Sequence, residues 1–345
     1  MTLQLAELTT LRLGGPVGRL VKAHTEAELV EAVRNADSAG EKLLVLAGGS
    51  NVVVADAGWP GTVVLVASRG VKRAGSRLSV QAGEPWDPLV AATVADGLAG
   101  FECLSGIPGS TGATPIQNVG AYGQEVSDTF VAVRAYDRRA GEIVELDAPA
   151  CAFTYRSSVF KREPGRWLIL RADFTLEPGG RSQPVRYAEL ARGLGIEVGE
   201  RAAVGEVRDA VLALRRGKGM VIDPDDPDSV SVGSFFTNPI LARKEFERLE
   251  ARVGPDARLP RFDEPDGRVK TSAAWLVERA GFERGHGLPG PVAISTKHSL
   301  ALTNRGAGTT AQLVTLAREV AVGVEHEFGV ELVPEPVFVG HAWRR

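Results

Sequence analysis

The sequence is poor in the residues that build disulfide-stapled, metal-binding or membrane-spanning proteins. Its 345 residues include two cysteines and five scattered histidines, so neither a disulfide framework nor a histidine-based metal site is expected. No apolar run is long enough for a membrane span, and no basic region precedes a hydrophobic core at the N-terminus. A net charge of −3 gives no general surface for nucleic acid. We therefore expect a reduced cytoplasmic protein with no metal, no membrane insertion and no nucleic-acid partner.

Glycine, in contrast, is abundant, and one stretch with almost no charge holds five of the 40 glycines. Residues 106–126 read GIPGSTGATPIQNVGAYGQEV, which fits neither an amphipathic helix nor a long strand. Glycines can adopt positive φ and let a ligand lie against bare amides, which together form an anion-binding concavity. An ordinary surface loop is the alternative, but it would seldom carry Ile107, Ile116, Val119 and Tyr122. We interpret this glycine loop (residues 106–126) as a buried segment around a flat polar ligand.

A second glycine segment lies upstream, between two apolar runs. Residues 43–56 read LLVLAGGSNVVVAD, which predicts a strand, a tight turn and another strand. The turn would present the amides of Gly49, Ser50 and Asn51 to a phosphate. By itself the pattern is also typical of a simple hairpin. We call residues 48–51 the glycine turn.

Taken together, these two segments resemble the FAD-binding part of the UDP-N-acetylenolpyruvoylglucosamine reductases (MurB-type), which make UDP-N-acetylmuramate for peptidoglycan. The resemblance covers nearly the whole chain, because further motifs follow in the same order. They are YRSSVFK at residues 155–161, GSFFTNP at 233–239, KTSAAWLVERAGF at 270–282 and LVPEPVFVG at 332–340. A set of motifs in order is far more specific than one glycine loop.

The resemblance implies FAD as the cofactor, NADPH as the reductant and UDP-N-acetylglucosamine enolpyruvate as the substrate. No G-x-G-x-x-G follows a strand and no Walker A pattern occurs, so no separate Rossmann domain for NADPH is expected. NADPH would then enter the same cleft as the substrate at a different time. The positions that match the family's FAD-binding segments are Gly48, Gly49, Ser50, Asn51, Gly109, Ser110, Thr111, Gly112, Thr114, Pro115, Gln117, Asn118, Gly120, Ala121, Tyr122 and Gly123.

Three residues match the family's catalytic positions. Hydride addition to the enolpyruvyl C=C bond sends negative charge into the carboxylate as an enolate, which needs a cation, hydrogen bonds and then a proton. The resemblance implies that Arg156 binds the carboxylate, that Glu335 stabilises the enolate and that Ser234 donates the proton. Without the family context, the residue types favour ordinary roles. Arg156 would form a structural salt bridge, Glu335 would be an exposed glutamate at a strand end, and Ser234 would be a turn or cap serine.

Four further residues are implied to bind the UDP-sugar, namely Tyr187, Lys218, Asn238 and Glu278. Tyr187 lies in residues 181–218, which we interpret as the tyrosine-bearing insertion of one class of the family, able to cover the nucleotide. A surface lysine and a helix-face glutamate are the alternatives for Lys218 and Glu278. The chain departs from the family pattern at Thr237, where the family often has lysine. A charged contact near the diphosphate or the nicotinamide phosphate is therefore in doubt.

The expected fold is α+β, with two small domains sandwiching FAD in the manner of the vanillyl-alcohol-oxidase/PCMH flavoproteins and a third domain for the substrate. We place the first FAD-binding subdomain at residues 1–67, completed by 329–345. The second FAD-binding subdomain covers 68–218, and the substrate-binding domain covers 219–328.

Local patterns predict the main elements. One helix is expected to begin at the capping box of Thr25 and Glu28, and further helices are expected at 85–96, 206–219, 242–251, 272–280 and 310–328. Strands are expected at 10–16, 43–46, 52–55, 62–66, 77–83, 129–137, 143–146, 167–176, 292–295, 300–304 and in the tail from 330. The stretch IDPDDPDS, with Asp223, Asp225, Asp226 and Asp228, lacks the spacing of a calcium loop and is interpreted as a solvated turn.

Two other functions stay open from the sequence. One is a flavin-dependent oxidase of the same fold superfamily; many of these hold flavin covalently through histidine, and the glycine segments contain none, although Cys103 leaves a thioether linkage open. The other is a non-catalytic UDP-sugar-binding module. Such a module would have no need of Arg156, Ser234 and Glu335 together. We expect a monomer.

Overall fold

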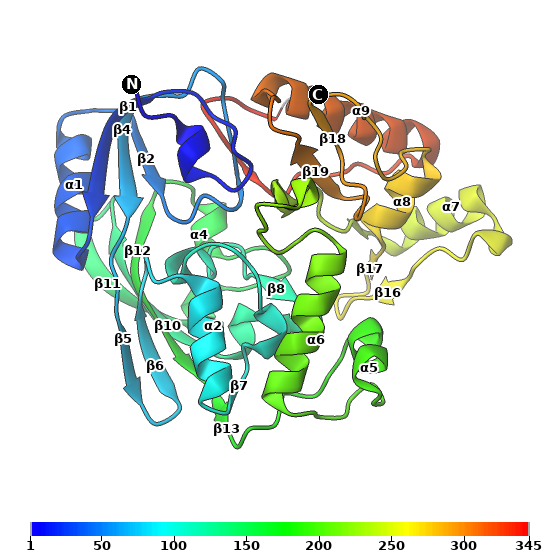
Figure 1. Ribbon diagram of the computed structural model, residues 1–345, viewed down its shortest axis with the longest axis horizontal. Coiled ribbons are helices and arrows are strands. Elements are labelled where there is room, and N and C mark those ends of the chain that lie inside the picture. The colour runs from blue at the N-terminus through cyan, green and yellow to red at the C-terminus, as the bar shows by residue number, and fades with distance from the viewer. Residues whose placement is uncertain (1, 344–345) are drawn as a thin grey trace. The chain divides into compact units, whose positions relative to one another are not determined.

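The computed structural model describes residues 2–343, which form two compact units. Unit 1 contains the N-terminal segment to Pro16, Ser50–Gly58 and the chain from Lys218 onward; unit 2 contains Val17–Gly49 and Trp59–Gly217. Figure 1 labels the helices and strands of both. The chain therefore crosses between the units several times, because a short segment around β3 (Val52–Val54) belongs to unit 1 while its neighbours on both sides belong to unit 2.

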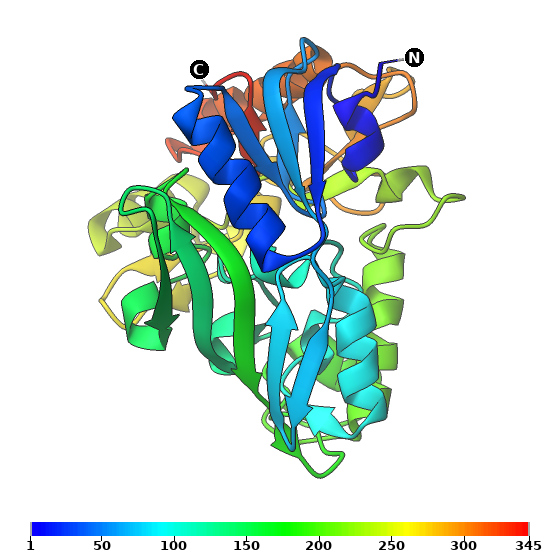
Figure 2. The ribbon, with the colours of Figure 1, turned by 90° about the vertical axis from the view of Figure 1, so that its left-hand side faces the viewer.

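Unit 2 begins with a small parallel sheet. Its strand order is β1 (Val17–Ala23), β4 (Trp59–Val66) and β2 (Leu43–Leu46), and the runs LLVL and TVVLV supply the β-branched and aliphatic residues that such strands need. Helix α1 (Glu26–Ser38) lies against β1 and β4, as Figure 2 shows. The helix begins at Thr25, whose hydroxyl accepts from the Glu28 amide at 3.1 Å, so the predicted cap is confirmed.

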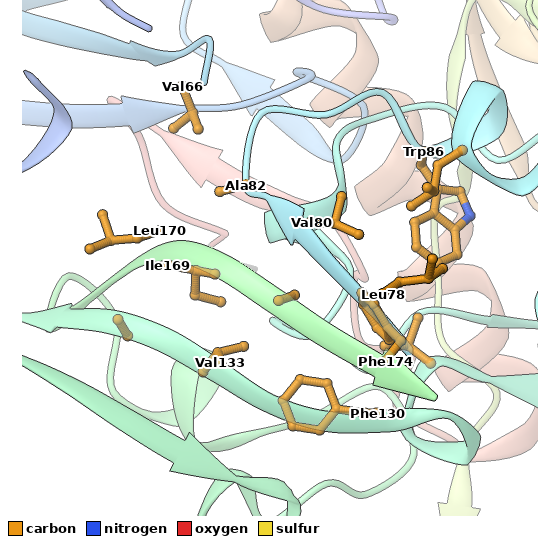
Figure 3. Packing of buried hydrophobic residues seen from close by; sticks show 14 of the residues in the cluster. Val66, Leu78, Val80, Ala82, Trp86, Phe130, Val133, Ile169, Leu170 and Phe174 are labelled. Carbon is orange, nitrogen blue, oxygen red and sulfur yellow. The ribbon is translucent and has the colours of Figure 1, made fainter. Parts of the chain in front are cut away.

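The second sheet of unit 2 is antiparallel and has the order β11–β10–β12–β6–β5. These strands span Glu142–Asp147, Phe130–Asp137, Trp167–Thr175, Arg77–Gln81 and Val71–Ala74. Its buried face packs on α2 (Trp86–Ala95), where the rings of Trp86 and Phe101 lie 4.7 Å apart and those of Phe101 and Phe174 lie 5.1 Å apart. Figure 3 shows this core around Trp86, Phe130 and Phe174. The aromatic cluster fixes the start of α2, which contacts the glycine loop.

Short elements complete unit 2. Two-stranded pairs join β7 (Leu98–Ala99) to β13 (Glu177–Pro178) and β8 (Gly120–Ala121) to β9 (Gln124–Glu125). The helices are α3 (Ala148–Cys151), α4 (Val159–Arg162), α5 (Ala188–Leu194) and α6 (Val204–Gly217), with 3₁₀ turns at Glu102–Leu104, Thr111–Ala113 and Val126–Asp128. Helices α5 and α6 lie in residues 181–218, the predicted insertion, and share a small core that includes Leu190, Val207 and Val211 together with Cys103.

Unit 1 contains the C-terminal part of the chain. Strand β3 pairs in parallel with β20 (Val337–Val339), and a three-stranded sheet has the order β14 (Ser231–Ser234), β19 (Ala301–Asn304) and β18 (Val292–Ile294). A smaller sheet joins β15 (Ile240–Leu241), β17 (Val269–Lys270) and β16 (Phe262–Asp263). The remaining helices are α7 (Arg243–Val253), α8 (Ala273–Arg279) and α9 (Thr310–Phe328), with 3₁₀ turns at Leu5–Leu8, Pro227–Ser229 and Pro255–Ala257.

Helix α9 has the ends and the buried stripe that its sequence predicts. The Thr309 hydroxyl accepts from the Gln312 amide, the Gln312 side chain accepts from the Thr309 amide, and Gly329 ends the helix at φ +67°. The predicted stripe lies in the core of unit 1 and consists of Leu313, Leu316, Ala317, Val320 and Val324. The stripe packs the helix against β18 and β19.

Two local predictions are wrong. Residues 10–15 form no strand: Arg12 adopts φ +53° and the Thr9 hydroxyl donates to the Leu13 carbonyl at 3.1 Å, so the apolar alternation reflects a turn that buries Leu11 and Leu13. Nor is Asp228 in a solvated turn. It is 3% exposed, and its carboxylate accepts from Thr296 and pairs with Arg305 at 2.6 Å. Helix α5 and strand β5 were not predicted.

The α+β composition is confirmed, since both units mix helices with sheets. The division into two FAD-binding subdomains and a substrate-binding domain stays a prediction, because it concerns ligands. Among residues 2–343, no helix combines the length and the apolar character that crossing a membrane requires.

Asp137, the buried last residue of β10, predicts how the unfolding free energy depends on pH. Asp137 pairs with Arg166 at 2.6 Å, and hydrogen bonds from Arg166 lower the pKa of Asp137 to about 2. An unfolded aspartate has a pKa of about 3.9, so this stabilisation is present above pH ~4 and is lost between pH ~4 and ~2. Asp137→Asn should therefore unfold more easily at neutral pH and should flatten the pH dependence of the unfolding free energy in that acidic window.

Urea titrations at neutral pH and across the acidic window measure this effect. Asp96→Asn is the matched control, because Asp96 forms a solvent-exposed ion pair with Arg73. An Asp137→Asn protein with the wild-type acid slope would contradict the assignment.

Candidate flavin and substrate site

The glycine turn and the glycine loop meet within unit 2. A Cβ atom added to Gly48 would lie 2.5 Å from the Cα atom of Gly109, which is closer than carbon atoms pack. Gly49 and Gly109 have φ values of +61° and +121°, which favour glycine. The two segments that the sequence predicts to bind one ligand therefore lie in backbone contact.

The glycine loop is held by backbone hydrogen bonds to the segment that leads into α2. The amide of Trp86 donates to the carbonyl of Gly109 at 3.1 Å, and the amide of Thr111 donates to the carbonyl of Glu84 at 2.8 Å. Gly112 packs so tightly that an added Cβ atom would lie 2.5 Å from the Cβ atom of Ala82. These contacts leave the loop little freedom to move.

Some polar side chains of the loop serve the loop itself. The hydroxyl of Thr111 donates to the Glu84 carbonyl at 3.0 Å, and that of Thr114 donates to the Thr111 carbonyl at 2.8 Å. Pro115 is buried and Gln117 is half-buried in the turn that follows. We therefore expect Thr111 and Thr114 to shape the loop rather than to lend their hydroxyl protons to a ligand.

Ser110 differs from Thr111 and Thr114 in its hydrogen bonding, and this difference tests whether the glycine loop fits FAD. Its hydroxyl oxygen is buried yet has no hydrogen-bond partner among residues 2–343, and the amides of Gly109 and Ser110 likewise donate to no acceptor in that range. Buried polar groups are normally satisfied, so these groups are consistent with a ligand that supplies acceptors. A diphosphate does so, and the residues present fit FAD.

Asn118 organises the second half of the glycine loop. It is 1% exposed and has φ +46°; its Nδ2 donates to the Glu125 carboxylate at 2.7 Å, and its Oδ1 accepts from the Ser127 amide at 3.0 Å. Gly120 and Ala121 then form β8, and Tyr122, with φ +49°, and Gly123 form the turn to β9. The Asn118 amide also donates to the Pro115 carbonyl at 3.3 Å, so both the side chain and the amide of Asn118 hold the loop itself.

Arg156 lies in a strained turn beside this segment. Its φ is +53°, and its guanidinium donates to the Gly120 carbonyl at 2.6 Å and lies 3.9 Å from the Glu125 carboxylate. The Lys161 ammonium donates to the Arg156 carbonyl at 3.1 Å. A non-glycine residue at positive φ costs free energy and persists only where its surroundings hold it, which is frequent at functional sites. Sequence reasoning had not identified Glu125; its place at the end of the glycine loop was the available signal.

Ser234 and Glu335 lie on neighbouring segments of unit 1. The amide of Glu335 donates to the carbonyl of Phe235 at 2.8 Å, next to Ser234 at the end of β14. Asn51 joins them, because its Nδ2 donates to the Glu335 carbonyl at 3.4 Å and its own carbonyl accepts from the Val337 amide at 2.9 Å. Gly233, at φ +76°, turns the chain before the serine. The structure thus brings together two predicted catalytic residues and one predicted flavin-binding residue.

The four predicted substrate-binding residues have different surroundings. Tyr187 is 40% exposed, and its ring meets the ring of Tyr122 edge-on at 5.3 Å, so the insertion touches the glycine loop. The Oδ1 of Asn238 accepts from the Ala273 amide at 3.0 Å, which holds the start of α8. Glu278 is exposed and lies 3.9 Å from the guanidinium of Arg284. Lys218 is half-buried just after α6.

Neither cysteine is set up for a covalent flavin link. Cys103 is 4% exposed, and burial together with the nearby Glu102 raises the pKa of its thiol, so it stays protonated at neutral pH. Burial also raises the pKa of Cys151 to about 12. Within residues 2–343, no group of three or more histidine, cysteine or acidic side chains is arranged to hold a metal ion.

Comparison with known proteins links both parts of the chain to the same enzyme family. The model described as "FAD binding domain" matches residues 17–147, and that described as "UDP-N-acetylenolpyruvoylglucosamine reductase, C-terminal domain" matches residues 225–339. The UDP-N-acetylenolpyruvoylglucosamine reductase of Streptomyces coelicolor is 57% identical over 343 residues, covering 98% of this chain and 89% of the relative. That of Mycolicibacterium smegmatis is 51% identical, covering 97% of this chain and 94% of the relative.

A solved structure agrees on the fold. The UDP-N-acetylenolpyruvylglucosamine reductase (MurB) from Thermus caldophilus superposes with a TM-score of 0.67 at 23% identity, covering 98% of both chains. At this identity the likeness shows the fold alone. Together with the FAD-binding-domain match, it confirms the predicted α+β flavin fold of the PCMH type.

The contact between the glycine segments can be tested with one methyl group. Gly48→Ala should raise the dissociation constant of FAD by about tenfold or more, since overpacking of this kind costs ~1–3 kcal/mol and 1.4 kcal/mol is tenfold. The measurement is FAD titration of the apoprotein by flavin fluorescence.

Gly193→Ala is the matched control, because a Cβ atom there would meet nothing within 4 Å. A Gly48→Ala protein that binds FAD as tightly as wild type would show that the turn can relax without loss of the site.

Proposed function

Because the chain belongs to the UDP-N-acetylenolpyruvoylglucosamine reductase family, we propose that it uses NADPH to reduce UDP-N-acetylglucosamine enolpyruvate to UDP-N-acetylmuramate. As a member of that family it is an FAD-dependent oxidoreductase of peptidoglycan precursor synthesis. The observation that carries the proposal from the chain's own geometry is the cluster of Ser234, Glu335 and Asn51.

The reaction adds a hydride to the terminal carbon of the enolpyruvyl group and a proton to the adjacent carbon. Bound FAD supplies the hydride, which it receives from NADPH. The protein has to hold the substrate carboxylate, stabilise the negative charge that grows on it and deliver the proton. Each of these tasks needs a different kind of side chain.

Arg156 is the proposed partner of the substrate carboxylate. A guanidinium is always charged and offers five donors in a planar fork that matches the geometry of a carboxylate, and the Gly120 carbonyl fixes one of its nitrogens. The Lys161 contact to its carbonyl and its positive φ support this role, because they fix the residue in one backbone conformation. Glu125 nearby would orient the guanidinium.

Ser234 and Glu335 are the proposed partners of the reacting carbons. The backbone hydrogen bond from Glu335 to Phe235 sets the spacing between their segments. Ser234 would donate its proton to the carbanion, while a protonated Glu335 would hydrogen-bond the enolate. A serine hydroxyl is a weak acid, so it must be reprotonated quickly by a neighbouring group or solvent.

Binding of the UDP-sugar is assigned to Tyr187, Lys218, Asn238 and Glu278. Lys218 suits a phosphate as a point charge, and the Asn238 amide still has its Nδ2 to donate although its Oδ1 holds α8. Glu278 has the weakest support, because it is exposed and near Arg284. Thr237 donates to the Val333 carbonyl at 3.3 Å and brings no charge where the family commonly has lysine.

The finer organisation is proposed on the same basis. Residues 1–67 with 329–345 and residues 68–218 would bind FAD, and residues 219–328 would bind the substrate. Pairing of β20 with β3 supports the return of the C-terminal segment to the first of these domains. We propose that NADPH and the UDP-sugar use the same cleft in turn, and that the enzyme works as a cytoplasmic monomer.

The direct test is an assay of the purified, yellow protein. NADPH oxidation should depend on UDP-N-acetylglucosamine enolpyruvate, and UDP-N-acetylmuramate should form in equal amount. Flavin reduction by NADPH with oxygen as the only effective acceptor would favour an oxidase instead.

Tyr187→Phe separates substrate binding from flavin reduction. The variant keeps the ring that meets Tyr122 but loses the hydroxyl of a residue proposed to bind the charged UDP-sugar, and a hydrogen bond to a charged group contributes ~1.5–3 kcal/mol. The substrate dissociation constant should rise by about tenfold or more, while NADPH reduces the flavin at the wild-type rate. Tyr136→Phe is the control, since the Tyr136 hydroxyl accepts from Arg34, outside residues 181–218 and the glycine loop. Unchanged substrate affinity would limit the insertion to a structural role.

Ser234→Ala tests the proton donor. Flavin reduction by NADPH needs no proton on the sugar ether and should stay near normal, while reoxidation by the enolpyruvyl substrate should slow by about 10²–10⁴-fold, the range of a positioned acid. Ser234→Cys should recover part of the rate, because a thiol also donates a proton. Stopped-flow absorbance resolves the two half-reactions. Reoxidation within a few-fold of wild type would make Ser234 a turn residue and move the search for the acid to Glu335.

A further inference from the structure

Helix α6 of the insertion is bound to the first residue of the glycine loop through Asp87. One oxygen of the Asp87 carboxylate accepts from the Gly106 amide at 2.6 Å and from Nη1 of Arg208 at 2.7 Å; the other accepts from Nη2 of Arg208 at 3.1 Å. Asp87 is in the first turn of α2, and Arg208 is in α6. The carboxylate therefore connects the loop to two helices at once.

The other backbone group of Gly106 is also held by α6. Arg215, which is 8% exposed, donates to the Gly106 carbonyl at 3.3 Å. Gly106 itself has φ +72°, so the chain turns sharply at this point and enters the segment that carries Gly109 and Ser110. Side chains thus fix both the amide and the carbonyl of Gly106. Arg215, which holds the carbonyl, and Arg208, which holds Asp87, both come from the insertion.

The electrostatics of Asp87 suit a fixed anchor. Burial would raise the pKa of its carboxyl, but hydrogen bonds from Arg208 and from the Gly106 amide outweigh this and lower it. The Arg208 and Asp87 side chains are 15% and 33% exposed, and their contact is two-pronged. A bidentate pair of this kind is stronger and more directional than an exposed pair.

We propose that Arg208 and Asp87 are positioning residues for FAD: their ion pair fixes Gly106, and through it the diphosphate-binding part of the glycine loop. The insertion then has a second role besides binding the UDP-sugar, because its arginines hold the glycine loop in the conformation that binds FAD. The proposal rests on the FAD-binding role of the glycine loop. It differs from a purely structural ion pair in that its loss weakens FAD binding more than it weakens the fold.

The test compares FAD affinity with thermal stability in a set of variants. Arg208→Met leaves the aliphatic packing but removes the bidentate partner, and should raise the FAD dissociation constant of the apoprotein by about tenfold; Arg208→Lys, which keeps the charge, should recover part of it. Asp87→Ala should weaken binding by a similar factor. The Asp87→Ala/Arg208→Met double variant should lose clearly less than the product of the two single effects, as for residues that act as a unit.

Arg201→Met is the matched control. Arg201 also belongs to the insertion and pairs with Glu177 at 2.7 Å. Within residues 2–343 its guanidinium contacts Glu177 and the Ser182 carbonyl rather than the glycine loop. It should bind FAD like wild type even if its melting temperature falls.

Two results would overturn the proposal. One is an FAD dissociation constant within twofold of wild type for Arg208→Met. The other is an equal loss for Arg201→Met, which would mean that any weakening of the insertion lowers FAD affinity. FAD titration of the apoprotein needs no turnover. A wild-type protein that binds FAD but fails to reduce the enolpyruvyl sugar would therefore contradict the proposed function alone. The FAD dissociation constants of the variants would still decide this inference.

Discussion

A segment that gives its backbone to a ligand must have the rest of its backbone groups satisfied by the protein, because unpaired buried amides and carbonyls cost free energy. The glycine loop obeys this constraint along its length. The carbonyls of Glu84 and Ala82 accept from its amides, Trp86 donates to it, and side chains hold Gly106 at its start. Among residues 2–343, the buried polar side-chain atoms of this loop without a hydrogen-bond partner include the Ser110 hydroxyl and the Nε2 atom of Gln124. The unpaired hydroxyl of Ser110 is consistent with the diphosphate site proposed for this loop.

Backbone strain is the second feature of the predicted site. In residues 2–343, non-glycine residues with positive φ include Asn118, Tyr122 and Arg156, all in or beside the glycine loop. Each is held by side-chain contacts: Asn118 by Glu125 and Ser127, Arg156 by Gly120 and Lys161, and the ring of Tyr122 by that of Tyr187. A strained backbone conformation persists only where its surroundings hold it, and these side-chain contacts are the surroundings that hold Asn118, Tyr122 and Arg156.

The sequence predicted well those features that rest on local chemistry. The limits of α9 follow from one capping box and one glycine, and the backbone contact between the glycine segments follows from residues that tolerate no side chain. Arg156, Ser234 and Glu335 came from resemblance, since their residue types alone favour ordinary roles. The family also implied that the tail returns to the first domain, but its pairing with β3 was not predicted, because a short apolar run does not reveal its partner.

Other features depend on tertiary contacts that local patterns do not encode. The acidic stretch 223–228 appears hydrophilic in the sequence, yet Asp228 is buried because Arg305 and Thr296, far away in the chain, satisfy its carboxylate. The alternation around Leu11 and Leu13 satisfies the strand rule but belongs to a turn, since Arg12 takes positive φ. Asp87 likewise resembles an ordinary first-turn acid of a helix. Only the structure shows that it accepts from Gly106 and Arg208.

The insertion illustrates how one segment can serve two ligands at once. Its tyrosine meets the far end of the glycine loop, at Tyr122, and its α6 arginines hold the near end, at Gly106. A segment that touches both ends of a cofactor loop cannot shift as a whole without changing at least one contact. The ring contact of Tyr187 with Tyr122 at one end, and the ion pair of Arg208 with Asp87 at the other, therefore couple the position of residues 181–218 to the conformation of the glycine loop.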